Sequence, residues 1–578
     1  MLADFLIYPV NTAPMNATRA REYLAKLHPS SLKVSFQELV IEIFGQESLV
    51  GDFPLVFGTA FCRGKLFSPG LIQDHSSLKG NYVILSDGNG KLNIEIDALR
   101  QFHIFSNPLS GLLTSSFLAA CHFLDSLTVN RMAFYEKMFR GYNIAPDTVF
   151  KEILHVHEEA QLNLDFYSLS DNRYRYKKHR YANRNEAIEV QVRVLDEYME
   201  ELKPLAGAMG VDLGISSGYD SRLLLALMTK HQFDHYQLHT HGIKGVSLHG
   251  FEQSITRQIA SSIGKEIRVV QVEPFNRLMN GQLDRAIEQN FNYFQGRNSH
   301  NMGAFTQTYA LPYKKEVMGK NRFSLNGLGG EIFRNYYYLP KQGINLRLFA
   351  QNHLFYRFSN WLVNEKQFDQ VLEFVKQKIE KRLGLPLHER TNLETLRRYY
   401  SEIRMPDGDG CNHNAHNKYF HFLTPFMEPG LYDAALGLTD WIGTGGDFEG
   451  ELINRVSPVL ASLPTHYGAT ATNPGWNTKL QRLIKVSMGQ KIQRKRFDYI
   501  ASRMTADNQS GRFLEHMKKE STYFREAWNN LTQSFNEINW NNIHLEFPCM
   551  VNSAMLSVTF YEFRQKINNP GVQSSVHP

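Results

Sequence analysis

The sequence predicts a mixed fold of the α/β plus α+β class: a β-rich N-terminal part, a parallel-sheet part and a helical C-terminal part. Residues 81–96 alternate apolar and polar side chains around Gly/Asn turns, which is typical of β-hairpins. Strand-like and helical segments then alternate over residues 186–272, as expected for a parallel sheet covered by helices. From about residue 346 onward, helical patterns dominate.

Length and composition narrow the class of protein. A chain of 578 residues is long enough for two to four domains. Its hydrophobic share of 42% and charged share of 21% are typical of soluble globular proteins, and a net charge of +6 is too modest to argue for nucleic acid. Four scattered cysteines without a Cys-x-x-Cys pair argue against a zinc site or a disulfide framework.

No targeting or membrane segment is expected. The first ten residues lack the basic start of a signal peptide. Residues 112–127 are apolar but short, and they are interpreted as a core helix rather than a membrane span. We therefore expect a cytoplasmic protein without membrane or nucleic-acid partners.

The parallel-sheet part is predicted element by element. The expected elements are a helix at 186–202, strands at 211–216, 235–240, 267–272 and 322–325, and helices at 221–230 and 252–263.

A loop rich in small residues joins the strand at 211–216 to the helix at 221–230. Small side chains let successive backbone N–H groups point at one phosphate, and a helix N-terminus adds partial positive charge. Asp220 would repel a phosphate unless it holds a magnesium ion. The residues predicted to bind nucleotide phosphates are Ser216, Ser217, Gly218, Tyr219, Asp220 and Ser221. An ordinary Ser/Gly-rich turn is the alternative.

A glycine-rich segment, Asn326-Gly327-Leu328-Gly329-Gly330-Glu331, follows the strand at 322–325. Its glycines permit the backbone to pass close to a ligand. Glu331 supplies a second carboxylate, suited to the same magnesium ion as Asp220. Ligand sites in open α/β sheets lie at the C-terminal ends of strands, so we expect Asp220 and Glu331 to meet there as a metal site.

These segments resemble those of a known enzyme family. The first loop is similar to the Ser-Gly-Gly-x-Asp-Ser loop of ATP pyrophosphatases, with Ser217 replacing the first glycine. The second resembles the Gly-x-Gly-x-Asp-Glu stretch of asparagine synthetases, and residues 424–431 look like their Pro-Phe-Leu-Asp segment. The resemblance implies ATP and Mg²⁺ as cofactors, and it implies that Gly214, Asn326 and Gly327 line the nucleotide.

The N-terminal part resembles, more loosely, the glutamine amidotransferase domain of the same enzymes, a β-sandwich of the N-terminal-nucleophile type. Residues 80–87 and 141–165 carry this likeness. The glutamine-using enzymes have a cysteine directly after Met1, whereas this chain has Leu2, which cannot attack a carbonyl group. We expect a catalytically silent domain at 1–170, a linker at 171–185, an ATP pyrophosphatase domain at 186–567 and a disordered tail at 568–578.

The resemblance implies an ATP-dependent ligase that forms amide bonds. In such enzymes a carboxylate attacks the α-phosphorus of ATP and releases pyrophosphate, after which an amine displaces AMP. The end of a basic stretch resembles the family's Arg-x-Lys-x-Gly-Phe segment, which makes Lys495 the predicted catalytic residue, with Arg494 fitting almost as well. The substrates would be a small-molecule or peptide carboxylate and an amine donor, as in β-lactam synthetases, carbapenam synthetases and lasso peptide cyclases. A homodimer is left open.

Other interpretations stay open because Leu328 stands where the family carries a base for the amine. With Leu2 and Ser217 it is a third change at a chemically active position, so the alternative is a nucleotide-binding pseudoenzyme or scaffold. A sulfur-inserting enzyme acting on transfer RNA is weaker, since no cysteine lies near the loop. The histidines that could replace the base by type, none of them singled out, are His239, His241, His300 and His421.

Overall fold

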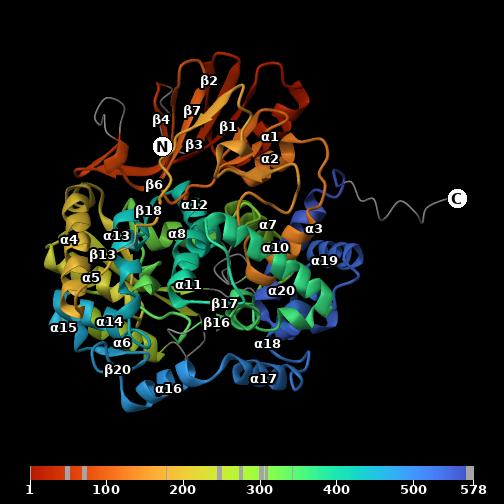
Figure 1. The fold of residues 1–578 in the computed structure, drawn as a ribbon. Helices are drawn as coiled ribbons and strands as arrows, with labels where there is room; N and C mark the ends of the chain where they lie inside the picture. Colours follow the sequence, from red (N-terminus) through yellow and green to blue (C-terminus); the bar gives the residue numbers. More distant parts are fainter. Residues whose placement is uncertain are drawn as a thin grey trace.

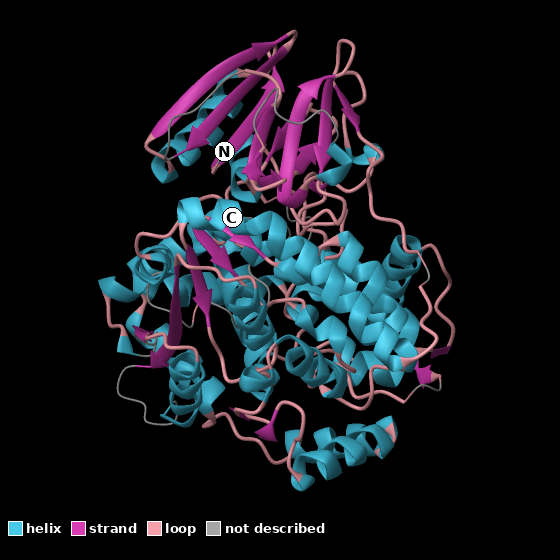
Figure 2. Cartoon of the chain, turned by 90° about the vertical axis from the view of Figure 1, so that its left-hand side faces the viewer, coloured by secondary structure: helices cyan, strands magenta, loops and turns pink. Residues whose placement is uncertain are grey.

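In the computed structural model, two β-sheets face each other at one end of the chain (Figures 1 and 2). The sheets have the strand orders β10-β8-β9-β1-β3-β2 and β11-β7-β6-β4-β5. Their strands are β1 (Ala3–Pro9), β2 (Ser30–Phe36), β3 (Leu39–Gly45), β4 (Leu55–Cys62), β5 (Lys65–Leu66), β6 (Lys79–Asp87), β7 (Leu92–Ile96), β8 (Phe105–Asn107), β9 (Leu112–Thr114), β10 (Leu154–His155) and β11 (Tyr167–Leu169).

The structure describes residues 2–45, 52–67, 75–177, 179–243, 250–272, 277–297, 305, 310–340 and 343–567. The predicted tail at 568–578 lies outside these residues, as does His300.

Apolar side chains from both sheets fill the space between them. Phe5 and Ile41 of one sheet pack with Phe57, Val83 and Ile94 of the other in a single buried cluster. The predicted hairpin is confirmed, since β6 and β7 pair in antiparallel fashion with Leu85 opposite Ile94. Antiparallel sheets that bury one face against each other are the expected result of the alternation in the sequence.

The core helix predicted at residues 112–127 is wrong at its start. Residues Leu112–Thr114 form β9, which pairs with β1, and only Phe117–Phe123 forms a helix, α2. Ser116 caps this helix by accepting a hydrogen bond from the backbone N–H of Ala119 at 3.1 Å. Thr114, Ser115 and Ser116 interrupt the apolar run between the two elements, and serine is a common N-cap residue, so the start of the helix was marked in the sequence.

Five parallel strands form the second layer of the fold, which confirms the predicted parallel sheet. Their order is β14-β13-β12-β15-β18. The strands are β12 (Val211–Gly214), β13 (Tyr236–Ile243), β14 (Ile267–Val272), β15 (Phe323–Leu325) and β18 (His421–Leu423), and the helices after the first two are α5 (Asp220–Lys230) and α6 (Gly250–Ser262). Sequence reasoning missed β18, which is only three residues long.

Helices dominate the C-terminal part, as predicted. The long helix α20 is apolar on nearly all sides and is buried among its neighbours. Helix α3, from the first 170 residues, packs against α20 and α10 (Figure 1). The helices named here and below are α3 (Arg131–Arg140), α4 (Arg184–Met209), α10 (Glu365–Leu383), α11 (Leu393–Tyr399), α13 (Pro429–Leu436), α14 (Asp447–Val456), α16 (Trp476–Ser487), α17 (Gln490–Ala501) and α20 (Phe547–Glu562).

Buried polar contacts join the sandwich to the parallel sheet. Asp4 pairs with Lys418 at 2.6 Å, and Thr59 of β4 lies 3.0 Å from the ring of His421 in β18. The edge strand β18 is thereby covered by β4 and β6 of the sandwich. Covering an edge strand satisfies the need to protect its unpaired backbone groups. Among the described helices, none is both long enough and apolar enough to cross a membrane.

Candidate functional site

The parallel sheet has a topological switch point between β12 and β15. The chain runs from β12 outward through β13 to β14 and then returns to place β15 on the other side of β12. Connections on the two sides diverge at such a point and leave a crevice outside the carboxyl ends of the strands, where ligands bind in open α/β sheets. The 215–221 loop leaves β12 at this point and the 326–331 segment leaves β15 beside it.

The 215–221 loop is held by its own hydroxyl groups. The backbone N–H of Ser216 donates to the Oγ of Ser221 at 3.1 Å, and that of Gly218 donates to the Oγ of Ser216 at 3.2 Å. The Oγ of Ser217 donates to the carboxylate of Glu252 at 3.3 Å and lies 3.0 Å from the Nδ1 of His466. The loop therefore already holds an anionic group, the carboxylate of Glu252.

The glycines of the 326–331 segment make room for Asp220. A Cβ at Gly327 would lie 2.8 Å from the backbone of Asp220 and Ser221, and a Cβ at Gly330 would lie 2.1 Å from the Oδ1 of Asp220. We predicted from the sequence that these glycines leave space for a ligand. In the structure, the space beside Gly327 and Gly330 is filled by the first residues of α5. Asn326 accepts a hydrogen bond from the N–H of Leu328 at 2.9 Å and so stabilises its own turn.

Two other predicted nucleotide residues have protein neighbours. Gly214 ends β12, where a Cβ would lie 3.1 Å from the ring of His239. Tyr219 is buried, its ring stacks on that of Tyr467 with centroids 5.1 Å apart, and Arg482 donates to its hydroxyl at 3.3 Å. Tyr219 therefore forms part of the wall of the loop rather than an exposed donor.

A single arginine connects the two predicted metal ligands. The Nη2 of Arg334 donates to both carboxylate oxygens of Asp220 at 2.6 Å and lies 3.6 Å from an oxygen of Glu331. Its Nε lies 3.6 Å from an oxygen of Glu449, which comes from α14. Tyr400 donates to the second oxygen of Glu331 at 2.7 Å. The expected meeting of Asp220 and Glu331 thus occurs, with a guanidinium between them.

Burial governs the charges of this cluster. Burial raises the pKa of Glu449 well above its usual range, and the neighbouring Asp220 adds to that rise. Burial also raises the pKa of Asp220, and Arg334 opposes the rise. For Glu331, the effect of burial is outweighed by Arg334 and the hydrogen bond from Tyr400, so its pKa is lowered. Arg334 is thus the guanidinium that faces the carboxyl groups of Asp220, Glu331 and Glu449.

This arrangement does not fit the predicted magnesium ion. Magnesium requires oxygen ligands in near-octahedral geometry at about 2.0–2.1 Å, yet both oxygens of Asp220 already accept hydrogen bonds from Arg334. A divalent ion on Asp220 would lie about 4 Å from the guanidinium, where their repulsion at an effective dielectric of about 20 is about 8 kcal/mol.

Two other buried arginines, Arg222 and Arg397, hold the chain around the carboxylate cluster through hydrogen bonds to backbone oxygens. Arg222 of α5 donates to the backbone oxygens of Leu460, Leu463 and Pro464 at 3.2, 2.8 and 2.6 Å. These bonds hold the chain that brings His466 and Tyr467 against the loop.

The turn that carries Glu331 is fixed in the same way. Arg397 of α11 donates to the backbone oxygens of Ile332 and Ala435 at 2.7 and 2.6 Å. It thereby ties the turn after β15 to α13.

Sequence reasoning missed most of the partners that complete the site, which are Arg334, Tyr400, Glu449, His466, Tyr467 and Arg482. The only local signal was the spacing of Glu331 and Arg334, which places them on one side of a short 3-10 turn. The others come from distant parts of the chain, and no motif connects them to the loop.

The predicted catalytic lysine is not brought to the loop. Lys495 is exposed on α17, which lies at the edge of the molecule opposite the sandwich (Figure 1). The alternative, Arg494, is buried and donates to the backbone oxygens of Gln351 and Arg357 at 3.0 and 2.7 Å. Its role in the described structure is therefore to attach α17.

The histidines considered as bases have structural neighbours. His239 lies 2.9 Å from Asp212 and packs against His241. His421 stacks on Phe323.

A cavity of about 750 Å³ lies beside the cluster. Arg404, which lines it, donates to the hydroxyl of Tyr336 at 3.3 Å, and its guanidinium lies 5.6 Å from the ring centroid of Tyr400. The other lining groups used below are Tyr337, Lys485 and Phe497. Arg404 and Tyr336 of the cavity wall contact the ring of Tyr400, whose hydroxyl donates to Glu331 of the carboxylate cluster.

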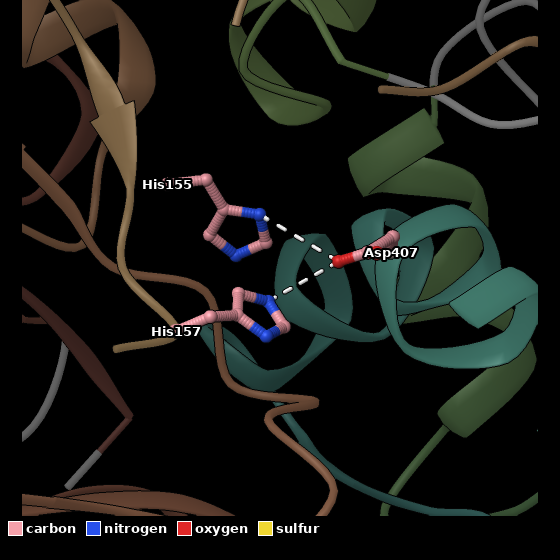
Figure 3. Close-up of side chains that lie close together, drawn as sticks. All are labelled: His155, His157 and Asp407. Atoms are coloured by element: carbon pink, nitrogen blue, oxygen red, sulfur yellow. Dashed lines mark ion pairs between the residues drawn. The ribbon is translucent and has the colours of Figure 1, made fainter. Parts of the chain in front are cut away.

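A separate group of possible metal ligands lies where β10 meets the C-terminal part (Figure 3). His155 and His157 approach Asp407, with ring nitrogens 3.9 and 3.2 Å from one carboxylate oxygen. Arg382 donates to both oxygens of Asp407, at 3.3 and 3.0 Å, and to the Nδ1 of His157. His157 therefore carries its proton on Nε2, facing Asp407, and offers no lone pair to a metal there. We assign this group to joining the two parts of the chain.

Comparison with known proteins adds no identification: no protein-family model matches this chain, and no curated protein matches it.

The substitution Gly330→Ala tests the close approach of the two segments. The new methyl group would collide with the Oδ1 of Asp220, and we expect it to lower the free energy of unfolding by about 1–3 kcal/mol. Gly430→Ala is the matched control, because a Cβ at Gly430 meets nothing within 4 Å. Urea unfolding of both variants measures the difference, and equal stabilities would contradict this geometry.

Acid should weaken the His157 contact. Burial lowers the pKa of His157 to about 4, so below pH 6.5 the unfolded chain binds a proton that the folded chain excludes. Stability is then unaffected above pH 6.5 and falls by up to about 3 kcal/mol as the pH drops to about 4. Urea unfolding between pH 7.5 and 4.5 should show a shallower decline for His157→Gln; an unchanged pH slope would refute the assignment.

Proposed function

We propose that this chain is an ATP-dependent ligase of the asparagine synthetase-like type. It activates a substrate carboxylate as an acyl-adenylate with release of pyrophosphate, and joins the acyl group to an amine with release of AMP. One observation carries the proposal: the 215–221 loop, Asp220 and Glu331 meet at the switch point between β12 and β15. Nucleotides bind open α/β sheets at such points.

The loop and the first turn of α5 supply donors for phosphate groups. The hydroxyls of Ser216 and Ser221 lie 3.2 Å apart, and the N-terminus of α5 adds its partial positive charge. The carboxylate of Glu252 is bonded to Ser217, so a bound phosphate would take its place. This anion-holding geometry supports a phosphate site at the loop.

In the first half-reaction, an oxygen of the substrate carboxylate forms a bond to the α-phosphorus of ATP. The bond from that phosphorus to the bridging oxygen breaks, and pyrophosphate leaves with the electron pair. The guanidinium of Arg334 lies beside Asp220 at the start of α5 and can stabilise this charge. Positioning and electrostatic stabilisation are most of what such a transfer needs.

In the second half-reaction, the amine attacks the acyl carbon, AMP leaves, and the amine loses a proton. Leu328 packs against the apolar cluster of the sheet and cannot accept that proton. The amine therefore has to react as the neutral base or pass its proton to another group. Leu2, also apolar and buried, supports a ligase that draws no ammonia from glutamine.

The cavity beside the cluster is proposed as the site of the acid substrate. Arg404 and Lys485 give its wall positive charge, which favours a carboxylate, and Tyr336, Tyr337 and Phe497 give it aromatic surface. Its volume of about 750 Å³ suits a molecule larger than a single amino acid. An acid bound there would lie next to Arg404 and Tyr336, which contact Tyr400.

A nucleotide-binding scaffold is the second candidate. It is favoured by the pairing of both Asp220 oxygens with Arg334 and by the apolar Leu328. A scaffold would bind the nucleotide without turnover.

A turnover assay distinguishes the ligase from the nucleotide-binding scaffold. Purified protein with ATP labelled at the α-phosphate, hydroxylamine as the amine, and a panel of sugar acids, acidic amino acids and short peptides should form AMP and pyrophosphate. We expect Asp220→Ala to slow AMP formation at least about 100-fold, the scale of losing one stabilising group. Gly430→Ala should leave the rate unchanged. Formation of ADP and phosphate would refute the ligase, whereas calorimetric binding of α,β-methylene-ATP without turnover would favour the scaffold.

A further inference from the structure

The guanidinium of Arg334 lies where the family resemblance puts a magnesium ion. Its Nη2 bonds both oxygens of Asp220 at 2.6 Å, and it is also the charged group between Asp220 and Glu331. A metal ion at this position would have to take its oxygens from the same two side chains. The structure thus gives the site a covalently attached cation.

Neighbouring groups hold the guanidinium of Arg334 between Asp220 and Glu331. Its side chain is only 11% exposed, and its Nη1 donates to the hydroxyl of Tyr467 at 3.3 Å. Glu331 and Arg334 are three residues apart in one 3-10 turn, so the turn itself directs both toward Asp220. The absence of a side chain at Gly330 is what lets Asp220 come close enough to pair.

The charge balance of the cluster depends on this arginine. Glu449 is fully buried beside Asp220. Arg334 is its nearest cation, at 3.6 Å. If the guanidinium were removed, the three carboxyl groups would lose the one cation that contacts all of them in the described structure, and their oxygens are of the kind that binds a divalent ion.

We infer that Arg334 is the resident cation of this site and takes the place of a protein-bound divalent metal ion. Its ligand class is the oxyanion of a phosphate chain, which a guanidinium binds through parallel N–H donors. The assignment of a nucleotide as that ligand rests on the proposed function; the replacement of the metal does not. The chain therefore holds no divalent ion between Asp220 and Glu331, and its affinity for a nucleotide does not depend on one.

Manganese binding tests the replacement directly. Electron paramagnetic resonance of free Mn²⁺ is followed as the full-length protein is added, without nucleotide. Wild-type protein should remove no more Mn²⁺ from solution than Asp220→Asn does. Arg334→Ala should bind one Mn²⁺ per chain, and the double variant Arg334→Ala/Asp220→Asn should lose that binding. Arg21→Ala, which breaks another arginine–carboxylate pair with two hydrogen bonds to Glu42, is the control and should resemble wild type.

Each outcome of the Mn²⁺ titration either supports the inference or overturns it. Stoichiometric Mn²⁺ binding by wild type that is lost in Asp220→Asn would overturn it, as would the absence of binding in a folded Arg334→Ala. If Arg334→Ala does not fold, Arg334→Gln replaces it, and the wild-type comparison with Asp220→Asn still decides.

A nucleotide arm separates this inference from the proposed function. Calorimetry of wild type with α,β-methylene-ATP should give affinities within about threefold in Mg²⁺ and in EDTA. A loss of thirtyfold or more in EDTA would overturn the inference. No binding under either condition would count against the proposed function, while the Mn²⁺ result would still stand.

Discussion

One guanidinium joins the two segments that leave the central strands of the parallel sheet. Arg334 donates hydrogen bonds to both carboxylate oxygens of Asp220 at the start of α5. The turn that precedes Arg334 carries Glu331 after β15. The loss of one partner from a buried pair of this kind costs about 3–5 kcal/mol, because a charge is left without compensation. The relative position of the 215–221 loop and the 326–331 segment therefore depends on this contact.

Close packing makes that contact achievable. Gly327 and Gly330 bring the backbone after β15 against the first turn of α5, where any larger residue would collide with Asp220. Arg222 and Arg397 bind backbone oxygens on either side and fix the flanking chain. The site is thus built on rigid elements, and rigid support is what positions functional groups to within a fraction of an ångström.

The sequence predicted the parts of the fold that local pattern controls. The strand before the 215–221 loop and the helix after it follow from an apolar run, small turn residues and helical spacing, and their meeting with Glu331 follows from the geometry of parallel strands. Residues 112–114 were missed as a strand because three residues are too few to show a periodicity. The short strand β18 was missed for the same reason.

The partners in the site could not be predicted in this way. Glu449 and Tyr400 reach Asp220 and Glu331 only through tertiary packing, and nothing in their local sequence marks them. Arg334 was visible, but a guanidinium and a metal ion satisfy the same two carboxylates. The distances place the guanidinium of Arg334 between them. Lys495 was chosen by resemblance alone, and packing places it on an exposed helix.

We propose that the two distant segments form one phosphate-binding site. Hydrogen exchange with mass spectrometry, in the presence and absence of α,β-methylene-ATP, tests it most directly. We expect the backbone amides of residues 215–222 and of residues 326–334 to gain protection from hydrogen exchange together, over the same range of nucleotide concentration. Protection of only one segment, or of neither at saturating nucleotide, would contradict it.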